Sequence, residues 1–132
     1  MIGLTRGMPT LLVVEDNEAS RDALARRLER RGYRVLLAGD GQQAVSVVRD
    51  EAPNIVLMDL GLPGIDGFEA TSRLKTDAAT QHIPIIVLSA HAMTNDRTLA
   101  LAAGADDFDT KPVRFQRLLE KIETLLKGVA GQ

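Results

Sequence analysis

Apolar residues form five short runs along the chain, separated by segments with a longer spacing of apolar positions. Three runs are almost continuously apolar and rich in β-branched residues, a pattern typical of strands buried on both faces: 9–15, 54–58 and 83–88. Two further runs, 33–38 and 106–110, carry more polar residues. They are expected to be edge strands of the same sheet.

Helical spacing and helix-capping residues occupy the segments after these runs. Five helices are predicted, at 17–31, 40–51, 67–76, 92–103 and 114–127. Asp16 or Asn17 is expected to cap the first helix, and Gly32 to end it. The last helix has the clearest apolar stripe, at Phe115, Leu118, Leu119, Ile122, Leu125 and Leu126.

Five alternations of strand and helix predict one α/β domain, with a doubly wound parallel sheet covered by helices on both faces. A chain of 132 residues is long enough for one such core and too short for two. We expect an N-terminal extension at 1–9, the domain at 10–127 and a short C-terminal tail at 128–132. Ligands of such sheets bind at the carboxyl ends of the strands.

The composition of the chain limits where this domain can be located and what it can bind. No apolar run approaches the roughly 20 residues that cross a bilayer, and the N-terminus lacks the apolar core of a signal peptide. We therefore expect a cytoplasmic protein without membrane insertion. The net charge of −2 predicts no direct binding to nucleic acid, and the absence of cysteine excludes disulfides and thiolate metal sites.

Charged residues follow three of the predicted strands. Glu15 and Asp16 come after the first run, Asp59 after the third, and Lys111 after the last. If the strands are parallel, these residues meet at one edge, where the repulsion between carboxylates must be offset. Mg²⁺ suits such a group of oxygen ligands. The alternative is that Asp16 only caps a helix and Glu15 is only solvated.

Asp59 opens a loop, 59–67, in which glycines and a proline bend the chain and leave the carboxylate exposed. Such a carboxylate can act as a nucleophile toward phosphorus. Ser89, at the end of the fourth run, could donate to a phosphoryl oxygen, and Lys111 supplies positive charge. The alternative for Ser89 is a helix N-cap.

With these residues in place, the chain resembles the receiver domain of bacterial response regulators, the CheY-like family, over 10–127. The matching motifs are Val14-Glu15-Asp16-Asn17, Leu57-Met58-Asp59-Leu60 with Pro63 and Asp66-Gly67, Leu88-Ser89-Ala90-His91-Ala92, and Gly104 through Lys111-Pro112. The resemblance implies a flavodoxin-like fold with strand order 2-1-3-4-5. It also implies a two-component phosphoacceptor, in which Asp59 accepts a phosphoryl group from a sensor histidine kinase or a histidine phosphotransfer protein.

The resemblance implies further roles at the site. Glu15, Asp16, Asp59 and the backbone carbonyl of Gly61 would hold Mg²⁺ or Mn²⁺. Lys111 and Ser89 would contact the phosphoryl oxygens, and the bond from Lys111 to Pro112 is expected to be cis.

The resemblance also implies a conformational switch. Ser89 would move toward the phosphoryl group and Phe108 would turn into the vacated space, although Phe108 could simply be a core residue. Gly61 and His91 occupy the positions that tune dephosphorylation in the family.

Partner surfaces follow in the same way. The fourth helix, fifth strand and fifth helix would contact a downstream protein, and the arginine-rich first helix would lie near the phosphodonor. The alternative for that helix is a solvated face with an ion pair between Asp22 and Arg26.

Other readings of the chain remain open. It could be a receiver excised from a hybrid histidine kinase or a larger response regulator. A Mg²⁺-dependent phosphatase of the haloacid-dehalogenase type needs a second acid two residues after the nucleophile, where this chain has Gly61. An FMN-binding protein is disfavoured because Glu15 and Asp16 would repel the phosphate. We expect no enzyme activity beyond the domain's own phosphorylation and dephosphorylation.

Overall fold

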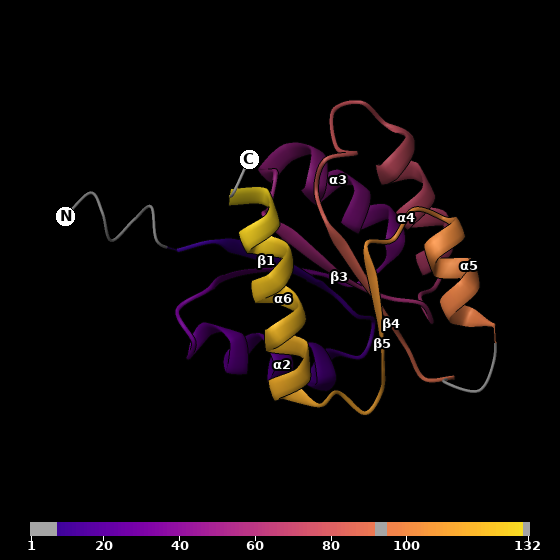
Figure 1. The fold of residues 1–132 in the computed structure, drawn as a ribbon. Helices are drawn as coiled ribbons and strands as arrows, with labels where there is room; N and C mark the ends of the chain where they lie inside the picture. Colours follow the sequence, from indigo (N-terminus) through magenta and orange to yellow (C-terminus); the bar gives the residue numbers. More distant parts are fainter. Residues whose placement is uncertain (1–7, 92–94, 131–132) are drawn as a thin grey trace.

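A computed structural model describes residues 8–91 and 95–130, which form five strands and five helices in alternation (Figure 1). In chain order the elements are β1 (Thr10–Val14), α2 (Glu18–Glu29), β2 (Arg34–Ala38), α3 (Gly41–Glu51), β3 (Ile55–Asp59), α4 (Gly67–Thr76), β4 (Ile85–Ser89), α5 (Asp96–Ala102), β5 (Asp107–Thr110) and α6 (Phe115–Ala130).

All five strands belong to one parallel sheet with the order β2-β1-β3-β4-β5. The predicted fold class and strand order are therefore confirmed, and the two more polar strands lie at the edges. The order reverses at β1, where β2 lies on one side and β3 on the other. This reversal opens the carboxyl end of the sheet, which is where such folds bind ligands.

Helices cover both faces of the sheet, with α2 and α6 on one side and α3, α4 and α5 on the other (Figure 1). Successive strand residues alternate between these layers, as strand geometry requires. In β1, Leu11 and Val13 pack with α2 and α6, whereas Leu12 and Val14 pack toward α3 and α4. Both apolar layers are closed, so β1, β3 and β4 are buried along their whole length apart from Thr10.

Three helices begin at capping side chains. Asn17 accepts a hydrogen bond from the backbone N–H of Ser20 at 2.9 Å, which selects Asn17 over Asp16 as the cap. Asp40 and Asp66 cap α3 and α4 in the same way. Because Asn17 serves as the cap, the carboxylate of Asp16 is left for other contacts.

Some predicted boundaries were wrong. β4 begins at Ile85 rather than at residue 83, after Pro84, which has no N–H to donate to a neighbouring strand. α5 begins at Asp96. The predicted start of that helix, at 92, lies outside the described residues, as do 93 and 94. α6 continues to Ala130, three residues past the predicted end at 127.

Asp22 makes a different contact from the one predicted. Its Oδ1 lies 3.9 Å from Nε of Arg21, and in the described part of the chain it makes no ion pair with Arg26. None of the helices in the described ranges is both long and apolar enough to cross a membrane.

Candidate functional site

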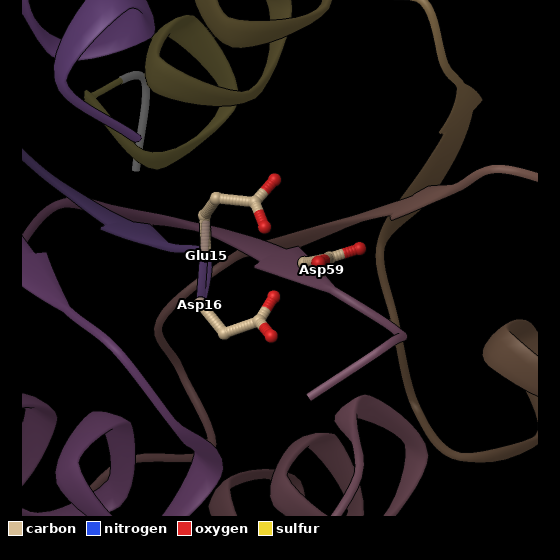
Figure 2. A group of neighbouring side chains, drawn as sticks. All are labelled: Glu15, Asp16 and Asp59. Atoms are coloured by element: carbon tan, nitrogen blue, oxygen red, sulfur yellow. The ribbon is translucent and has the colours of Figure 1, made fainter. Parts of the chain in front are cut away.

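Three carboxylates converge where β1 and β3 end (Figure 2). Glu15 and Asp16 directly follow β1, and Asp59 is the last residue of β3. Each side chain contributes a carboxylate oxygen, and these oxygens all lie within 4.8 Å of one another. Glu15 and Asp59 are buried, at 8% and 6% exposure, whereas Asp16 is exposed. The parallel pairing of β1 with β3 thus brings together acids that are far apart in the sequence.

The chain around Asp59 fixes that residue from several directions. The backbone N–H of Leu60 donates to the carbonyl of Leu88 at 3.1 Å, so pairing with β4 continues past the acid. Gly67 packs on the strand end so closely that a Cβ there would lie 2.4 Å from the carbonyl oxygen of Asp59. The N–H of Gly61 donates to Oδ1 of Asp59 at 3.4 Å. The predicted bend therefore wraps around the carboxylate, and the expectation that it would leave Asp59 exposed was wrong, because these contacts bury the side chain.

Lys111 joins the acids from the end of β5. Its Nζ lies 2.7 Å from Oε1 of Glu15 and 3.0 Å from Oδ1 of Asp59. Its backbone N–H donates to the carbonyl of Ser89 at 2.7 Å, and its peptide bond to Pro112 is cis. Lys111 thereby links the ends of β1, β3 and β4.

The two buried acids differ in their electrostatics. Burial raises the pKa of Asp59, and the charge of Glu15 adds to this effect, so the pKa lies above its ordinary value despite Lys111. Burial also acts to raise the pKa of Glu15, but hydrogen bonds from Lys111 and from the N–H of Asn17 outweigh it and lower that pKa. Burial disfavours the charged form of Lys111, yet both carboxylates raise its pKa overall. Both shifts favour the charged forms, so the Glu15 carboxylate and the Lys111 ammonium group form a stable ion pair.

The charge of the site is not balanced by Lys111 alone. Three carboxylates face one ammonium group, and a divalent cation would offset the excess. Carboxylate oxygens are the ligands that Mg²⁺ and Mn²⁺ prefer. The backbone at Gly61 is open, since a Cβ there would meet no atom of the described residues within 4 Å. The residues present therefore fit a hard divalent cation.

Ser89 ends β4 close to this group, and its side chain is buried at 1% exposure. Its hydroxyl donates to Oδ2 of Asp96 at 2.6 Å and accepts from the N–H of His91 at 2.9 Å. The structure therefore brings Glu15, Asp16, Asp59 and Lys111 together, but it commits the hydroxyl of Ser89 elsewhere.

Phe108 and His91 lie at opposite extremes of exposure. Phe108 is 5% exposed and packs in the apolar layer on the α3, α4 and α5 side of the sheet. His91 is exposed and follows β4. The burial of Phe108 agrees with a core residue and leaves its switching role a prediction.

Two residues near the site were missed from the sequence. Asp96 binds Ser89, as described above. Arg21 is only 20% exposed, and its Nη1 lies 3.4 Å from the carbonyl oxygen of Glu15. The available signal for Arg21 was its place one helical turn after the cap Asn17, which turns it back toward the end of β1.

A cavity of about 280 Å³ adjoins the acids on the side of α2. Its wall includes Ala23 and Leu24 of α2, and Pro112 and Val113 after β5. Arg27 also lines it, with its guanidinium 4.2 Å from the ring centre of Phe115. The arginines of α2 are therefore not all part of a purely solvated face.

Similar proteins share both the sequence and the fold. A sequence model of the response regulator receiver domain matches residues 11–123. Protein PilH of Pseudomonas aeruginosa is 38% identical over 121 residues, which is 92% of this chain and 100% of PilH. The transcriptional regulatory protein AfsQ1 of Streptomyces coelicolor is 39% identical over 120 residues, which is 91% of this chain. That match covers only 52% of AfsQ1, so the chain spans about half of that relative.

Solved structures agree with these matches. The receiver domain of a sensor histidine kinase from Pseudomonas aeruginosa superposes with a TM-score of 0.84 and 34% identity, over 90% of this chain and 98% of that domain. That structure holds a magnesium ion coordinated in its active-site cleft. On sequence, strand order and architecture, this chain belongs to the response regulator receiver domain family of two-component signalling.

Proposed function

We propose that Asp59 accepts a phosphoryl group from a phosphohistidine and that the domain changes conformation as a result. The observation that supports this assignment is the position of Asp59. It is a buried carboxylate at a strand end, 3.0 Å from the ammonium of Lys111 and beside two further acids. Family membership supports the class of reaction, and this geometry supports the choice of Asp59.

The transfer needs little from the protein beyond positioning and charge. A carboxylate oxygen of Asp59 attacks phosphorus while the bond from phosphorus to the imidazole nitrogen breaks, and the electron pair leaves with the imidazole. The transition state is loose and spreads negative charge over three equatorial oxygens. Lys111 is within reach of an oxygen on Asp59 and would neutralise part of that charge.

A divalent cation completes the charge balance in this proposal. Mg²⁺, or Mn²⁺, would be held by Glu15, Asp16, Asp59 and the backbone carbonyl of Gly61. When bound, the cation supplies positive charge to the phosphoryl oxygens. The magnesium in the related kinase receiver domain supports this choice. Glu15 remains paired with Lys111, so Asp16 is the more accessible ligand.

The readout of phosphorylation would pass through Ser89 and Phe108. Ser89 turns its hydroxyl toward the phosphoryl group, and Phe108 moves into the space that Ser89 leaves. Phe108 has no hydroxyl, so it signals through burial alone. Gly61 and His91 would tune the hydrolysis of the acyl phosphate, because they lie two residues after the acceptor and the switch residue, at the positions that tune it in the family.

Two surfaces are assigned to partners. The cavity between α2 and Pro112–Val113 is where a sensor histidine kinase or a histidine phosphotransfer protein would dock, because it is the apolar opening beside Asp59. α5, β5 and α6 would contact the downstream protein. We propose a cytoplasmic location, no direct contact with nucleic acid, and no reaction beyond the domain's own phosphorylation and dephosphorylation.

The test is phosphorylation by a small donor. The protein is incubated with Mg²⁺ and acetyl phosphate, and its intact mass is measured. We expect the wild type to gain one phosphoryl group and Asp59→Asn to gain none. Asp77→Asn, which lies after α4, is the control and should match the wild type. No mass gain in the wild type, or an equal gain in Asp59→Asn, would refute the assignment.

A further inference from the structure

We infer that Asp96 holds the hydroxyl of Ser89 away from the phosphoacceptor and releases it when Asp59 is phosphorylated. This inference rests on the proposed function of Asp59. It adds Asp96 as a positioning residue that sets how readily the domain switches.

The hydroxyl of Ser89 already makes two hydrogen bonds in this structure. A serine hydroxyl has one proton to donate. In this structure that proton goes to Oδ2 of Asp96, at 2.6 Å, while the oxygen accepts from the N–H of His91 at 2.9 Å. The hydroxyl therefore cannot donate to a phosphoryl oxygen at Asp59 without leaving Asp96.

The hydrogen bond between Ser89 and Asp96 is short, at 2.6 Å. A short hydrogen bond from a hydroxyl to a carboxylate is charge-assisted and is roughly twice as strong as a neutral one. Ser89 is 1% exposed, so water does not replace the partner easily. Asp96 thus stabilises the unphosphorylated arrangement, and a phosphoryl group must compete with it for one proton.

Asp96 also connects two elements of the fold through its hydrogen bond to Ser89. Asp96 is the first residue of α5, and Ser89 is the last residue of β4. Their hydrogen bond therefore joins the end of β4 to the start of a helix on the proposed output surface. When the bond breaks, the change at Ser89 acts directly on the start of α5.

Loss of Asp96 should shift the equilibrium between the unphosphorylated and phosphorylated arrangements in one direction. A ligand shifts a two-state equilibrium through its different affinities for the two states. Removing Asp96 leaves the buried hydroxyl without its acceptor in the unphosphorylated state, and does not remove its contact with a phosphoryl group. Loss of Asp96 should therefore favour the phosphorylated arrangement.

The test uses beryllofluoride, an anion that mimics a phosphoryl group on a carboxylate, in the presence of Mg²⁺. Its affinity is measured by titration calorimetry, a readout that needs no turnover. We expect Asp96→Ala to bind it about tenfold more tightly than the wild type, equivalent to about 1.4 kcal/mol. Asp96→Asn, which keeps a neutral acceptor, should show a smaller gain. Glu120→Ala, which removes an exposed charge from α6, should show none.

A second comparison, made in the Ser89→Ala variant, distinguishes the loss of the hydrogen bond from the simple loss of the negative charge of Asp96. In Ser89→Ala, the further change Asp96→Ala should leave the affinity unaltered, because the hydroxyl that Asp96 holds is already absent. The same gain in both backgrounds would overturn the inference, as would no gain in both Asp96→Ala and Asp96→Asn. Thermal unfolding of each variant confirms that the comparison is between folded proteins. If the wild type itself binds no beryllofluoride, the proposed function of Asp59 fails as well.

Discussion

Lys111 determines the charge balance of the site at the scale of single residues. Its ammonium group contacts both Glu15 and Asp59, so each acid is partly neutralised without a cation. Asp16 differs from both, because it is exposed and makes no ion pair within the described ranges. In the proposed cation site, Asp16 is therefore the ligand whose substitution should have the least effect on the metal-free fold.

Asp16→Asn should remove most of the stabilisation that Mg²⁺ gives to the folded protein. A ligand at 100 times its Kd stabilises the folded state by about 2.7 kcal/mol. We expect the wild type to gain stability as Mg²⁺ is added and Asp16→Asn to gain much less, as measured by thermal unfolding. Glu18→Gln, an equal charge change nearby on α2, should respond like the wild type. Equal responses of wild type and Asp16→Asn would remove Asp16 from the cation site.

The sequence predicted the charged members of the site because strand ends meet in a parallel sheet. Glu15, Asp16, Asp59 and Lys111 needed only the strand pattern and the topology. The bond between Ser89 and Asp96 could not be predicted, because it depends on a side-chain rotamer and on where α5 begins. Arg21 was missed for a similar reason, since the pattern of α2 alone does not say which arginine turns toward Glu15.

At the scale of elements, the contact between β5 and α6 centres on Asp109. This carboxylate is 6% exposed, and Arg117 of α6 binds both of its oxygens, at 2.6 and 3.1 Å. Burial acts to raise the pKa of Asp109, but Arg117, the N–H of Thr110 and the charge of Lys121 outweigh it and lower the pKa. The ionised form of Asp109 therefore stabilises the fold.

The lowered pKa of Asp109 determines how its contribution to stability changes with pH. A carboxylate with a lowered pKa in the folded state contributes stability above its ordinary pKa, and loses it as the pH falls through the folded-state pKa. Asp109→Asn should lower the free energy of unfolding by about 1.5–3 kcal/mol at neutral pH, because a buried charged hydrogen bond is lost. Urea unfolding should show this difference shrinking in acid. The exposed Asp50→Asn is the control, and a difference for Asp109→Asn that is independent of pH would contradict the account.

The close approach of α4 to β3 supports a second prediction at this scale. A Cβ at Gly67 would lie 2.4 Å from the carbonyl oxygen of Asp59 and 2.9 Å from Cα of Leu60, and backbone atoms cannot yield cheaply. Gly67→Ala should therefore cost about 1–3 kcal/mol of stability. Gly61→Ala, where a Cβ meets nothing within 4 Å in the part of the chain that the structure describes, should be close to neutral. Similar losses in urea unfolding for both variants would contradict this packing.

Elements themselves were largely predictable, because periodicity and caps act locally. Asn17, Asp40 and Asp66 begin their helices through contacts with residues three positions later. The predicted start of α5, at 92, lies outside the described residues, and its cap Asn95 makes no side-chain capping bond. Where a helix lacks a capping bond, its start depends on packing that the sequence does not reveal.

At the scale of the whole molecule, the sheet separates two apolar layers that contact different parts of the site. The layer of α2 and α6 borders the cavity beside Asp59, whereas Phe108 lies in the layer of α3, α4 and α5. A change at Asp59 that passes through Ser89 and Phe108 would therefore reach the second layer.

Hydrogen exchange measures this directional effect. With Mg²⁺ and beryllofluoride, we expect altered protection in α5 and β5, because the hydrogen bond between Ser89 and Asp96 joins β4 to α5. α3 ends at Glu51, shortly before the start of β3 and so at the opposite end of the parallel sheet from Ser89, and its C-terminal half should be unchanged. Equal protection of α5 and β5 with and without the anion would argue against a switch on this surface.

The most direct test of the central claim is chemical mapping of the phosphorylated residue. The protein is treated with acetyl phosphate and Mg²⁺ and then with borohydride, which reduces an aspartyl phosphate to homoserine, and its peptides are sequenced by mass spectrometry. We expect homoserine at position 59, and its loss when Mg²⁺ is removed by a chelator. Homoserine at position 16 instead, or unmodified aspartate at both positions, would contradict it.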